Sequence, residues 1–196
     1  MKKKFFLFVL IIAACFMITG CEDEEENEMV TGKVNVEIVV KDKGTIELEL
    51  DADTAPITVN NFVNLVKNKF YDGLTFHRII EGFMIQGGDP LGNGTGGSST
   101  NIKGEFAANG VENNISHVRG VISMARNGFD YNSASSQFFI VHKDSTFLDG
   151  NYAAFGHVTS GMEVVDKIAE GAKVEDDNGT VLKENQPTIE KIRIKK

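Results

Sequence analysis

The sequence predicts a mainly β domain of about eight short strands and two helices. Residues 34–40 (VNVEIVV) and 45–50 (TIELEL) alternate apolar and polar side chains, and the turn sequence KDKG separates them. This pattern is typical of a hairpin with one buried face. We expect further strands in six short apolar stretches that are separated by segments rich in Gly, Asn and Ser: 75–80, 83–87, 120–125, 137–142, 153–158 and 188–194.

The first predicted helix follows the hairpin. Asp53 or Thr54 can cap it, and Pro56 falls in its first turn, where a missing backbone N–H costs nothing. An apolar stripe then runs through Phe62, Leu65, Val66 and Phe70.

The second predicted helix covers 161–170. Ser160 and Glu163 have the spacing of a capping box, and Gly171 can end the helix. Its apolar stripe consists of Val164, Val165 and Ile168.

The N-terminus has the pattern of an export signal. Lys2, Lys3 and Lys4 precede an apolar run over 5–18, which is shorter than the roughly 20 residues that a membrane-spanning helix needs. Residues 18–21 (ITGC) resemble the bacterial lipobox, in which a cysteine is acylated and becomes the new N-terminus. We therefore expect a lipoprotein signal peptide over 1–20 and a lipidated Cys21; an ordinary signal peptide with a chance cysteine, or an uncleaved anchor, is the alternative.

Residues 21–32 follow as an acidic segment that includes EDEEENE, with almost no apolar side chain to bury. We expect a disordered tether there and one folded domain over 33–196. Cys15 and Cys21 are the only cysteines, so the domain has no thiol and cannot form a disulfide.

The composition excludes several function classes. A formal net charge of −8 argues against a nucleic-acid partner. A literal G-x-G-x-x-G over 92–97 follows Asp89-Pro90 rather than a strand and leads into SSTN rather than a helix, so we expect no dinucleotide cofactor. No G-x-S-x-G nucleophile motif occurs. We expect no metal, because four histidines lack local ligand spacing: His77, His117, His142 and His157.

Residues 75–89 (TFHRIIEGFMIQGGD) combine one arginine with an apolar run. A cation among apolar residues is costly to bury unless other groups orient it. Arg78 therefore either points to solvent from an ordinary hairpin or belongs to a site, in which Gln86, eight residues further on, could orient it.

This stretch resembles the signature of the cyclophilin family of peptidyl-prolyl isomerases. SMAR at 123–126, SSQFFI at 135–140, FLDG at 147–150 and AAFGHV at 153–158 follow in the family's order, so the resemblance runs from about residue 34 to the C-terminus. It implies a closed eight-stranded antiparallel β-barrel capped by two α-helices. The strand pattern alone leaves closure open, although side chains can fill a barrel of eight strands.

The resemblance also implies the site. Arg78, Gln86 and Phe83 would be catalytic: Arg78 would donate to the prolyl nitrogen of a twisted amide, and Gln86 would orient it. Gln137 and the main chain at Ala125 and Arg126 would hold the residues before proline in extended form. The full set of implied substrate contacts is His77, Met84, Ala125, Arg126, Gln137, Phe139, Phe147, Leu148 and Tyr152. Among these, His77 is expected to be a hydrogen-bonding residue beneath the site.

Two considerations qualify this assignment. Spacing alone would make Phe83, Met84 and Phe139 ordinary core residues, and only the resemblance moves them to a cleft. The chain also has Phe147, Tyr152 and Arg126 where eukaryotic members commonly have Trp, His and Asn. Because Phe147 has no indole N–H to donate, we expect at most weak binding of cyclosporin.

The sequence thus predicts a monomeric peptidyl-prolyl isomerase that is lipid-anchored outside the cytoplasm and acts on proline-containing segments of unfolded exported proteins. The alternative is a non-catalytic chaperone module at the membrane surface that binds proline peptides in the same cleft. A hydrolase or a solute-binding protein has no residue constellation behind it.

Overall fold

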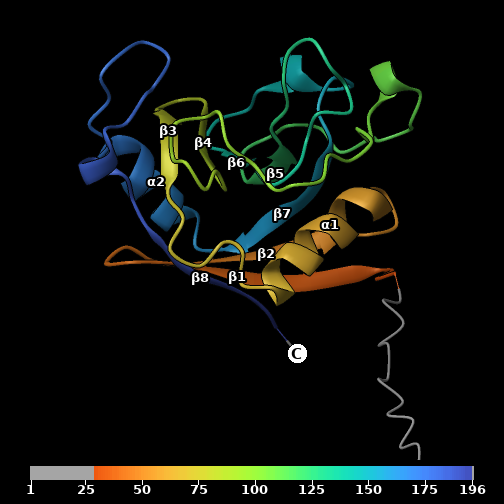
Figure 1. Cartoon of the computed structure of the whole chain (residues 1–196), viewed down its shortest axis with the longest axis horizontal. Coiled ribbons are helices and arrows are strands. Elements are labelled where there is room, and N and C mark those ends of the chain that lie inside the picture. Colours follow the sequence, from red (N-terminus) through yellow and green to blue (C-terminus); the bar gives the residue numbers. More distant parts are fainter. Residues whose placement is uncertain (1–28, 196) are drawn as a thin grey trace, which may run out of the picture.

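The computed structural model describes residues 29–195, and within them the eight expected strands form one sheet (Figure 1). Each strand lies within two residues of its predicted position, because alternating side chains and turn sequences define both ends. The strands are β1 (Lys33–Val40), β2 (Gly44–Asp51), β3 (Phe76–Ile80), β4 (Met84–Gly87), β5 (Val121–Met124), β6 (Phe138–Val141), β7 (Ala154–Ser160) and β8 (Ile189–Ile194).

The strand order is β3-β4-β6-β5-β7-β2-β1-β8, and every neighbouring pair is antiparallel. The sheet curls until its two edges meet. At the first residues of β3 and β8, the Ile189 N–H donates to Leu74 O at 2.7 Å, and the Phe76 N–H donates to Pro187 O at 2.9 Å. The predicted fold of eight antiparallel strands with two helices is confirmed as a curled sheet, whose edge strands β3 and β8 meet through a few main-chain hydrogen bonds and not through a full ladder.

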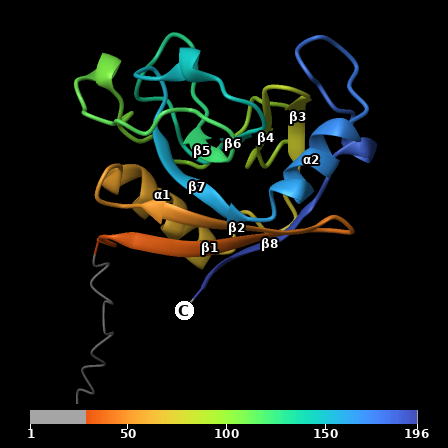
Figure 2. The same ribbon diagram turned by 180° about the vertical axis from the view of Figure 1, so that it is seen from behind.

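The two α-helices lie at opposite ends of the curled sheet (Figures 1 and 2). Helix α1 (Pro56–Lys67) packs against β2 and β8, and α2 (Met162–Glu170) packs against β2, β3 and β4. The predicted N-terminal caps are wrong in both cases, whereas Gly171 ends α2 as predicted. Ala55 is the N-cap of α1, whereas Asp51 binds the Thr54 N–H one turn earlier.

Helix α2 starts from Gly161 instead of from a capping box. Ser160 stays in strand β7, and Gly161 has a left-handed backbone with φ of 89°. A side chain at position 161 would collide with the main chain of Thr45 and Ile46, so glycine is needed both for the conformation and for the close approach to β2.

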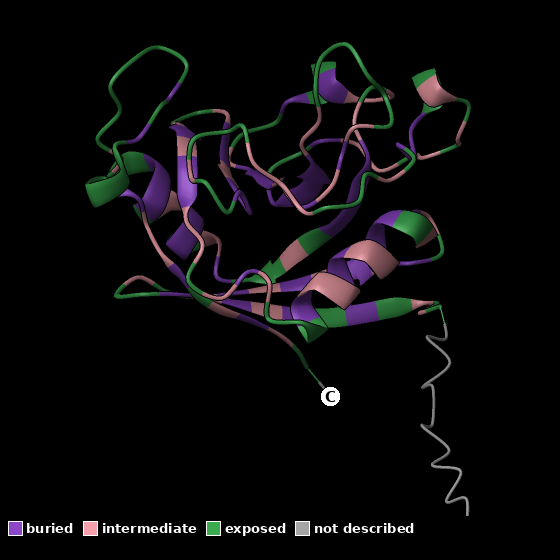
Figure 3. Ribbon diagram, viewed as in Figure 1, coloured by how far each residue is buried: buried purple, intermediate pink, exposed green. Residues whose placement is uncertain are grey.

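The walls of the barrel near β5 and β6 are buried on both faces (Figure 3). Alternate residues such as Phe138 and Ile140 enter the main core, together with Phe62 of α1. Their neighbours Phe139 and Val141 point the other way and join a second apolar cluster. This second cluster lies on the outer side of the wall, and its members include most of the predicted pocket residues.

The described part of the chain makes its first contacts just before strand β1. The Val30 N–H donates to Asn60 Oδ1 at 2.7 Å, and the Gly32 N–H donates to Asp53 Oδ1 at 2.9 Å. These residues at the end of the predicted tether therefore belong to the fold. The predicted signal peptide, Cys21 and the acidic run up to residue 28 lie outside the described residues. Over 29–195, no helix is long and apolar enough to span a membrane.

Candidate active site

The hairpin of β3 and β4 places the two polar side chains of the central stretch side by side. Arg78 and Gln86 are direct partners in the antiparallel register, so their side chains project from the same face. The intervening partners Ile79 and Ile85 are buried in the main core. Arg78 therefore faces the outer side of the barrel wall, where the second apolar cluster lies.

Hydrogen bonds from two directions hold the Arg78 guanidinium. Its Nη1 donates to Gln86 Oε1 at 3.2 Å, and its Nε donates to the main-chain oxygen of Asn178 at 2.8 Å. Burial lowers the pKa of Arg78 from its ordinary value, whereas Tyr152 and Asp176 act in the opposite direction. An arginine with that balance remains charged at neutral pH. Among residues 29–195, no carboxylate forms a salt bridge with it.

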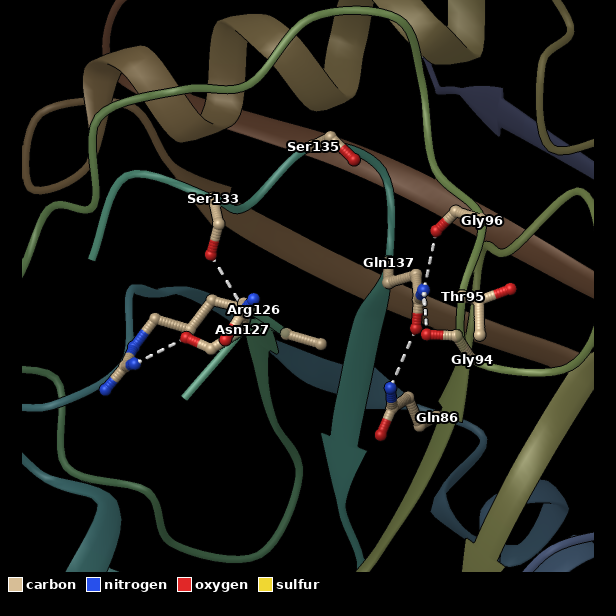
Figure 4. A pocket seen from close by; sticks show the side chains of 10 residues that line it. Gln86, Gly94, Thr95, Gly96, Arg126, Asn127, Ser133, Ser135 and Gln137 are labelled. Carbon is tan, nitrogen blue, oxygen red and sulfur yellow. Dashed lines mark hydrogen bonds between the residues drawn. The ribbon is translucent and has the colours of Figure 1, made fainter. Parts of the chain in front are cut away.

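A chain of amides extends from the guanidinium. Gln86 Nε2 donates to Gln137 Oε1 at 2.9 Å, and Gln137 Nε2 donates to the main-chain oxygens of Gly94 and Gly96 at 3.1 and 2.7 Å (Figure 4). Because every donor in the chain has an acceptor, the orientation of each amide is fixed. Gln86 thus presents its oxygen to Arg78 and not its nitrogen.

Beside Arg78 lies an apolar cavity of about 280 Å³. Met84, Phe139 and Leu148 form its interior and are buried, whereas Phe147 is 72% exposed at its edge and packs on Phe83 with ring centroids 5.6 Å apart. The residues that line the cavity were all predicted for the site: Arg78, Phe83, Met84, Gln86, Ala125, Arg126, Phe139, Phe147, Leu148 and Tyr152.

A second, polar pocket of about 370 Å³ adjoins the apolar cavity and shares Gln86, Ala125 and Arg126 with it (Figure 4). The two together make one elongated cleft. The lining residues of the polar pocket are Gln86, Gly94, Thr95, Gly96, Ala125, Arg126, Asn127, Ser133, Ser135 and Gln137.

The main chain at Ala125 is only partly available to a peptide. Its N–H already donates to Gln137 O at 2.9 Å. A bound segment would therefore have to use the Ala125 carbonyl or the Arg126 N–H.

Three hydrogen-bonded polar residues, His117, Ser123 and Asp149, form a group that packs against Phe139 through its histidine ring. The His117 ring is stacked on the Phe139 ring with centroids 6.0 Å apart, its Nε2 lies 3.0 Å from Ser123 Oγ, and its Nδ1 lies 2.9 Å from Asp149 Oδ1. This Ser-His-Asp arrangement has the connectivity of a hydrolytic triad. Ser123 is fully buried, however, so its hydroxyl is not accessible as a nucleophile, and the arrangement supports the position of Phe139.

His77 lies apart from the predicted site. It is buried and lines neither cavity, and both of its ring nitrogens lack a hydrogen-bond partner within residues 29–195. Its ring lies beneath Gly94 in the loop that Asp89 organises by accepting the N–H groups of Leu91, Asn93 and Gly94. The expected hydrogen-bonding role of His77 is therefore not seen.

Several residues that contribute to the cleft are not evident from the sequence. Asn178 is 100 residues from Arg78, and the DDNGT sequence around it signals only a turn. Phe106 and Tyr131 stack on the Arg126 guanidinium, and nothing in their local sequence indicates this. No group of three His, Cys, Asp or Glu side chains in the described chain is arranged to hold a metal ion.

The curled antiparallel sheet, with a guanidinium beside an apolar cavity on its outer wall, defines the class of protein as a small β-barrel with a cleft on its outer face. The model of the family described as cyclophilin type peptidyl-prolyl cis-trans isomerase/CLD matches residues 35–196, and the chain belongs to this family. Its relatives include a peptidyl-prolyl cis-trans isomerase of Helicobacter pylori, 45% identical over 81% of this chain and 95% of that protein. Peptidyl-prolyl cis-trans isomerase B of Bacillus subtilis is 44% identical over 74% and 92% of the two chains.

Solved structures agree with this assignment. A Cryptosporidium parvum cyclophilin type isomerase is 30% identical and superposes with a TM-score of 0.74, covering 84% of this chain and 98% of that one. The same protein in the presence of the dipeptide Ala-Pro superposes with a TM-score of 0.72, covering 83% and 99%.

Proposed function

We propose that this member of the isomerase family accelerates X-Pro isomerisation in exported proteins from a lipid anchor at Cys21, with Arg78 as the catalytic donor. Rotation about an X-Pro bond faces a barrier of about 18–20 kcal/mol because amide resonance must be broken. No covalent bond is cleaved, so the reaction needs neither a nucleophile nor a metal. It needs groups that bind the twisted amide better than the planar one.

The single observation that carries the catalytic assignment is the state of Arg78. Its Nη1 and Nε are held by Gln86 and Asn178, and no carboxylate of the described chain forms a salt bridge with it. Within residues 29–195 its Nη2 has no protein partner, so N–H donors remain for a ligand. The prolyl nitrogen accepts a hydrogen bond only once its lone pair has left conjugation, so such a donor acts selectively on the transition state.

The apolar cavity supplies the second requirement. Phe83, Met84 and Phe139 surround a volume suited to a small ring, and we assign the prolyl ring to it. The Cryptosporidium relative, whose crystal structure was determined in the presence of the dipeptide Ala-Pro, supports a proline-containing ligand for this family. In our assignment the residues that precede proline extend into the polar pocket past Gln137.

The test is a protease-coupled isomerisation assay on the chain from residue 29 onward. Arg78→Ala should lower kcat/KM at least about tenfold, which corresponds to about 1.4 kcal/mol of transition-state stabilisation. Arg119→Ala, which removes a surface arginine paired with Asp166, is the matched control and should retain the wild-type rate. A wild-type chain that leaves the uncatalysed rate unchanged would overturn the proposal.

The same variants separate the enzyme from the alternative chaperone module. A module that only binds would prevent aggregation of unfolded proteins equally well in the wild-type chain and in Arg78→Ala, because the apolar cavity remains. We expect the refolding of a proline-limited client to slow to the uncatalysed rate with Arg78→Ala, since isomerisation rather than binding is removed.

The location rests on the sequence alone. The apolar run over 5–18 followed by the lipobox-like residues 18–21 supports export and acylation. An acidic run from residue 22 to residue 28 then separates the anchor from Val30, which in the described chain is bonded to Asn60 of helix α1. We propose that this run keeps the cleft clear of the lipid surface and open to client proteins.

A further inference from the structure

The four arginines of the chain fall into two pairs. Arg119 and Arg193 lie on the surface, and each forms a salt bridge, with Asp166 at 2.8 Å and with Asp72 at 2.9 Å. Arg78 and Arg126 form none within residues 29–195, and both line the apolar cavity. The two arginines without a carboxylate partner are therefore in the same cleft.

The cleft has no acidic lining residue among the described part of the chain. Neither the apolar cavity nor the polar pocket includes an Asp or a Glu. The carboxylates on bordering segments, Asp130, Asp149 and Asp176, accept hydrogen bonds from their own or adjacent loops. The chain as a whole carries a formal charge of −8. The cleft is thus a local positive site on an acidic protein, a distribution that favours anionic ligands.

The Arg126 side chain is held in place before any ligand arrives. Its guanidinium carbon lies 4.7 Å from the centroid of Tyr152, 4.9 Å from Tyr131 and 5.3 Å from Phe106. In its plane, Nε donates to Asn151 O at 3.0 Å and Nη1 donates to Asn127 O at 2.9 Å. Nη2 has no hydrogen-bond partner in the described part of the chain, so one edge of a rigid cation remains open.

The position of Arg126 determines which part of a ligand it can reach. It borders both cavities, and in Figure 4 its guanidinium points away from Gln137. A side chain that points out of the cleft from a residue bound next to the prolyl ring would meet it. A carboxylate there would bind a guanidinium that is already held in place. The protein would therefore lose little conformational entropy on binding it.

We propose that Arg126 is a specificity-determining residue that selects X-Pro segments with an Asp or Glu at one of the two positions before proline. The inference rests on the proposed function and on the peptide orientation given there. A bare structural role is the competing explanation, in which Arg126 only fastens the 127–133 loop to residue 151. If Arg126 were only structural, replacing it would change kcat/KM by the same factor for all peptides. If it determines specificity, replacing it changes the ratio of kcat/KM between acidic and neutral peptides.

The experiment compares kcat/KM of the full chain in detergent for proline peptides that differ only in Glu, Gln or Lys at each of the two positions. At low ionic strength we expect Glu to exceed Gln at least about threefold at one position, with Lys below Gln, as befits a partly exposed ion pair. The preference should shrink in about 0.5 M salt, where charges are screened within a few Å.

Variants then assign the preference to one residue. Arg126→Gln should bring the ratio of Glu to Gln peptides to about one, whatever its overall rate, and Arg126→Lys should keep a ratio above one because the charge remains. Arg119→Gln is the matched control and should retain the wild-type ratio.

Equal acceleration of all peptides by the wild-type chain would overturn the inference and leave the proposed function intact. A preference for Glu that persists in Arg126→Gln would overturn it as well, because the selectivity would then come from Arg78. If no peptide is accelerated, the proposed function fails together with the inference.

Discussion

Arg78 and Gln86 face each other across the β3–β4 ladder, with Nη1 of the arginine 3.2 Å from Oε1 of the glutamine. Gln86 in turn donates to Gln137, so the orientation of the Arg78 guanidinium, the proposed donor, depends on an amide that Gln137 itself holds in place. The arrangement predicts that Gln86 acts through Arg78.

The corresponding variant is Gln86→Leu, which keeps the bulk of the side chain and removes both hydrogen bonds. A hydrogen bond of this kind contributes about 0.5–1.5 kcal/mol, so loss of the bond to Arg78 should lower kcat/KM about two- to twelvefold. In an Arg78→Ala background the same substitution should cost much less, and a double-mutant cycle measures that coupling. Additive losses in the two backgrounds would show that Gln86 acts independently of Arg78.

The segment around Asn178 forms the other side of the guanidinium site, and Gly179 holds that segment against β3. The Ile79 N–H donates to Gly179 O at 2.8 Å, and a Cβ at position 179 would collide with the main-chain oxygen of Ile79. Gly179→Ala should therefore displace Asn178 and lower kcat/KM about three- to tenfold, as expected when an orienting group is lost.

A matched control separates displacement from backbone strain. Gly110 has φ of 73°, close to the 79° of Gly179, but nothing lies within 4 Å of a Cβ added there. Both alanine variants should lose about 1 kcal/mol of unfolding free energy through the left-handed conformation. Only Gly179→Ala should lose activity. An equal loss of activity in Gly110→Ala would remove the role of the Asn178 segment.

The contrast between Gln86 and Asn178 explains how much of the site the sequence could predict. Two residues on one hairpin share a face whenever their register pairs them, so local alternation was enough to place Arg78 beside Gln86. Asn178 reaches Arg78 only because the chain returns past β3 before entering β8. That contact depends on the path of a loop, which cannot be read from the periodicity of apolar residues in the sequence.

The same reasoning applies to the buried pocket residues. Every residue of β6 is buried, which shows that both faces of the strand are covered, so spacing alone could not separate the core residue Phe138 from the pocket residue Phe139. Family resemblance supplied that distinction. The capping box at Ser160 failed for a different reason, because strand β7 extends through Ser160 and the helix starts from the glycine that follows.

The proposed lipid anchor predicts that replacing the Cys21 sulfur changes the cellular location of the protein. Cys21→Ser removes the thiol that would be acylated, and the protein should move from the membrane fraction to the soluble extracytoplasmic fraction. Cys15→Ser is the matched control, because that residue lies within the expected signal peptide and should leave the location unchanged. Fractionation followed by immunoblotting measures both, and continued membrane association of Cys21→Ser would exclude the lipid anchor.

Two buried histidines predict how stability depends on pH. Burial lowers the pKa of both His77 and His117 below the ordinary value near 6.5, although Asp89 and Asp149, respectively, oppose the shift. Between the folded and unfolded pKa values the unfolded chain binds more protons, so the free energy of unfolding rises with pH there. Stability should be constant above about pH 7 and should fall as the pH drops through about 6.5.

His77→Leu tests how much of this loss of stability at acid pH comes from His77, which lies beneath the 89–96 loop. Both ring nitrogens of His77 lack hydrogen-bond partners in the described chain, so an apolar replacement leaves no acceptor unpaired and should not destabilise the fold at pH 8 by more than about 1 kcal/mol. The fall in Tm between about pH 7 and about pH 5 should become shallower, because one of the two titrating groups is gone. His157→Gln, at an exposed position of β7, should leave the slope unchanged. If His77→Leu retains the full wild-type slope, then His117 and its contacts to Ser123 and Asp149 account for the acid sensitivity alone.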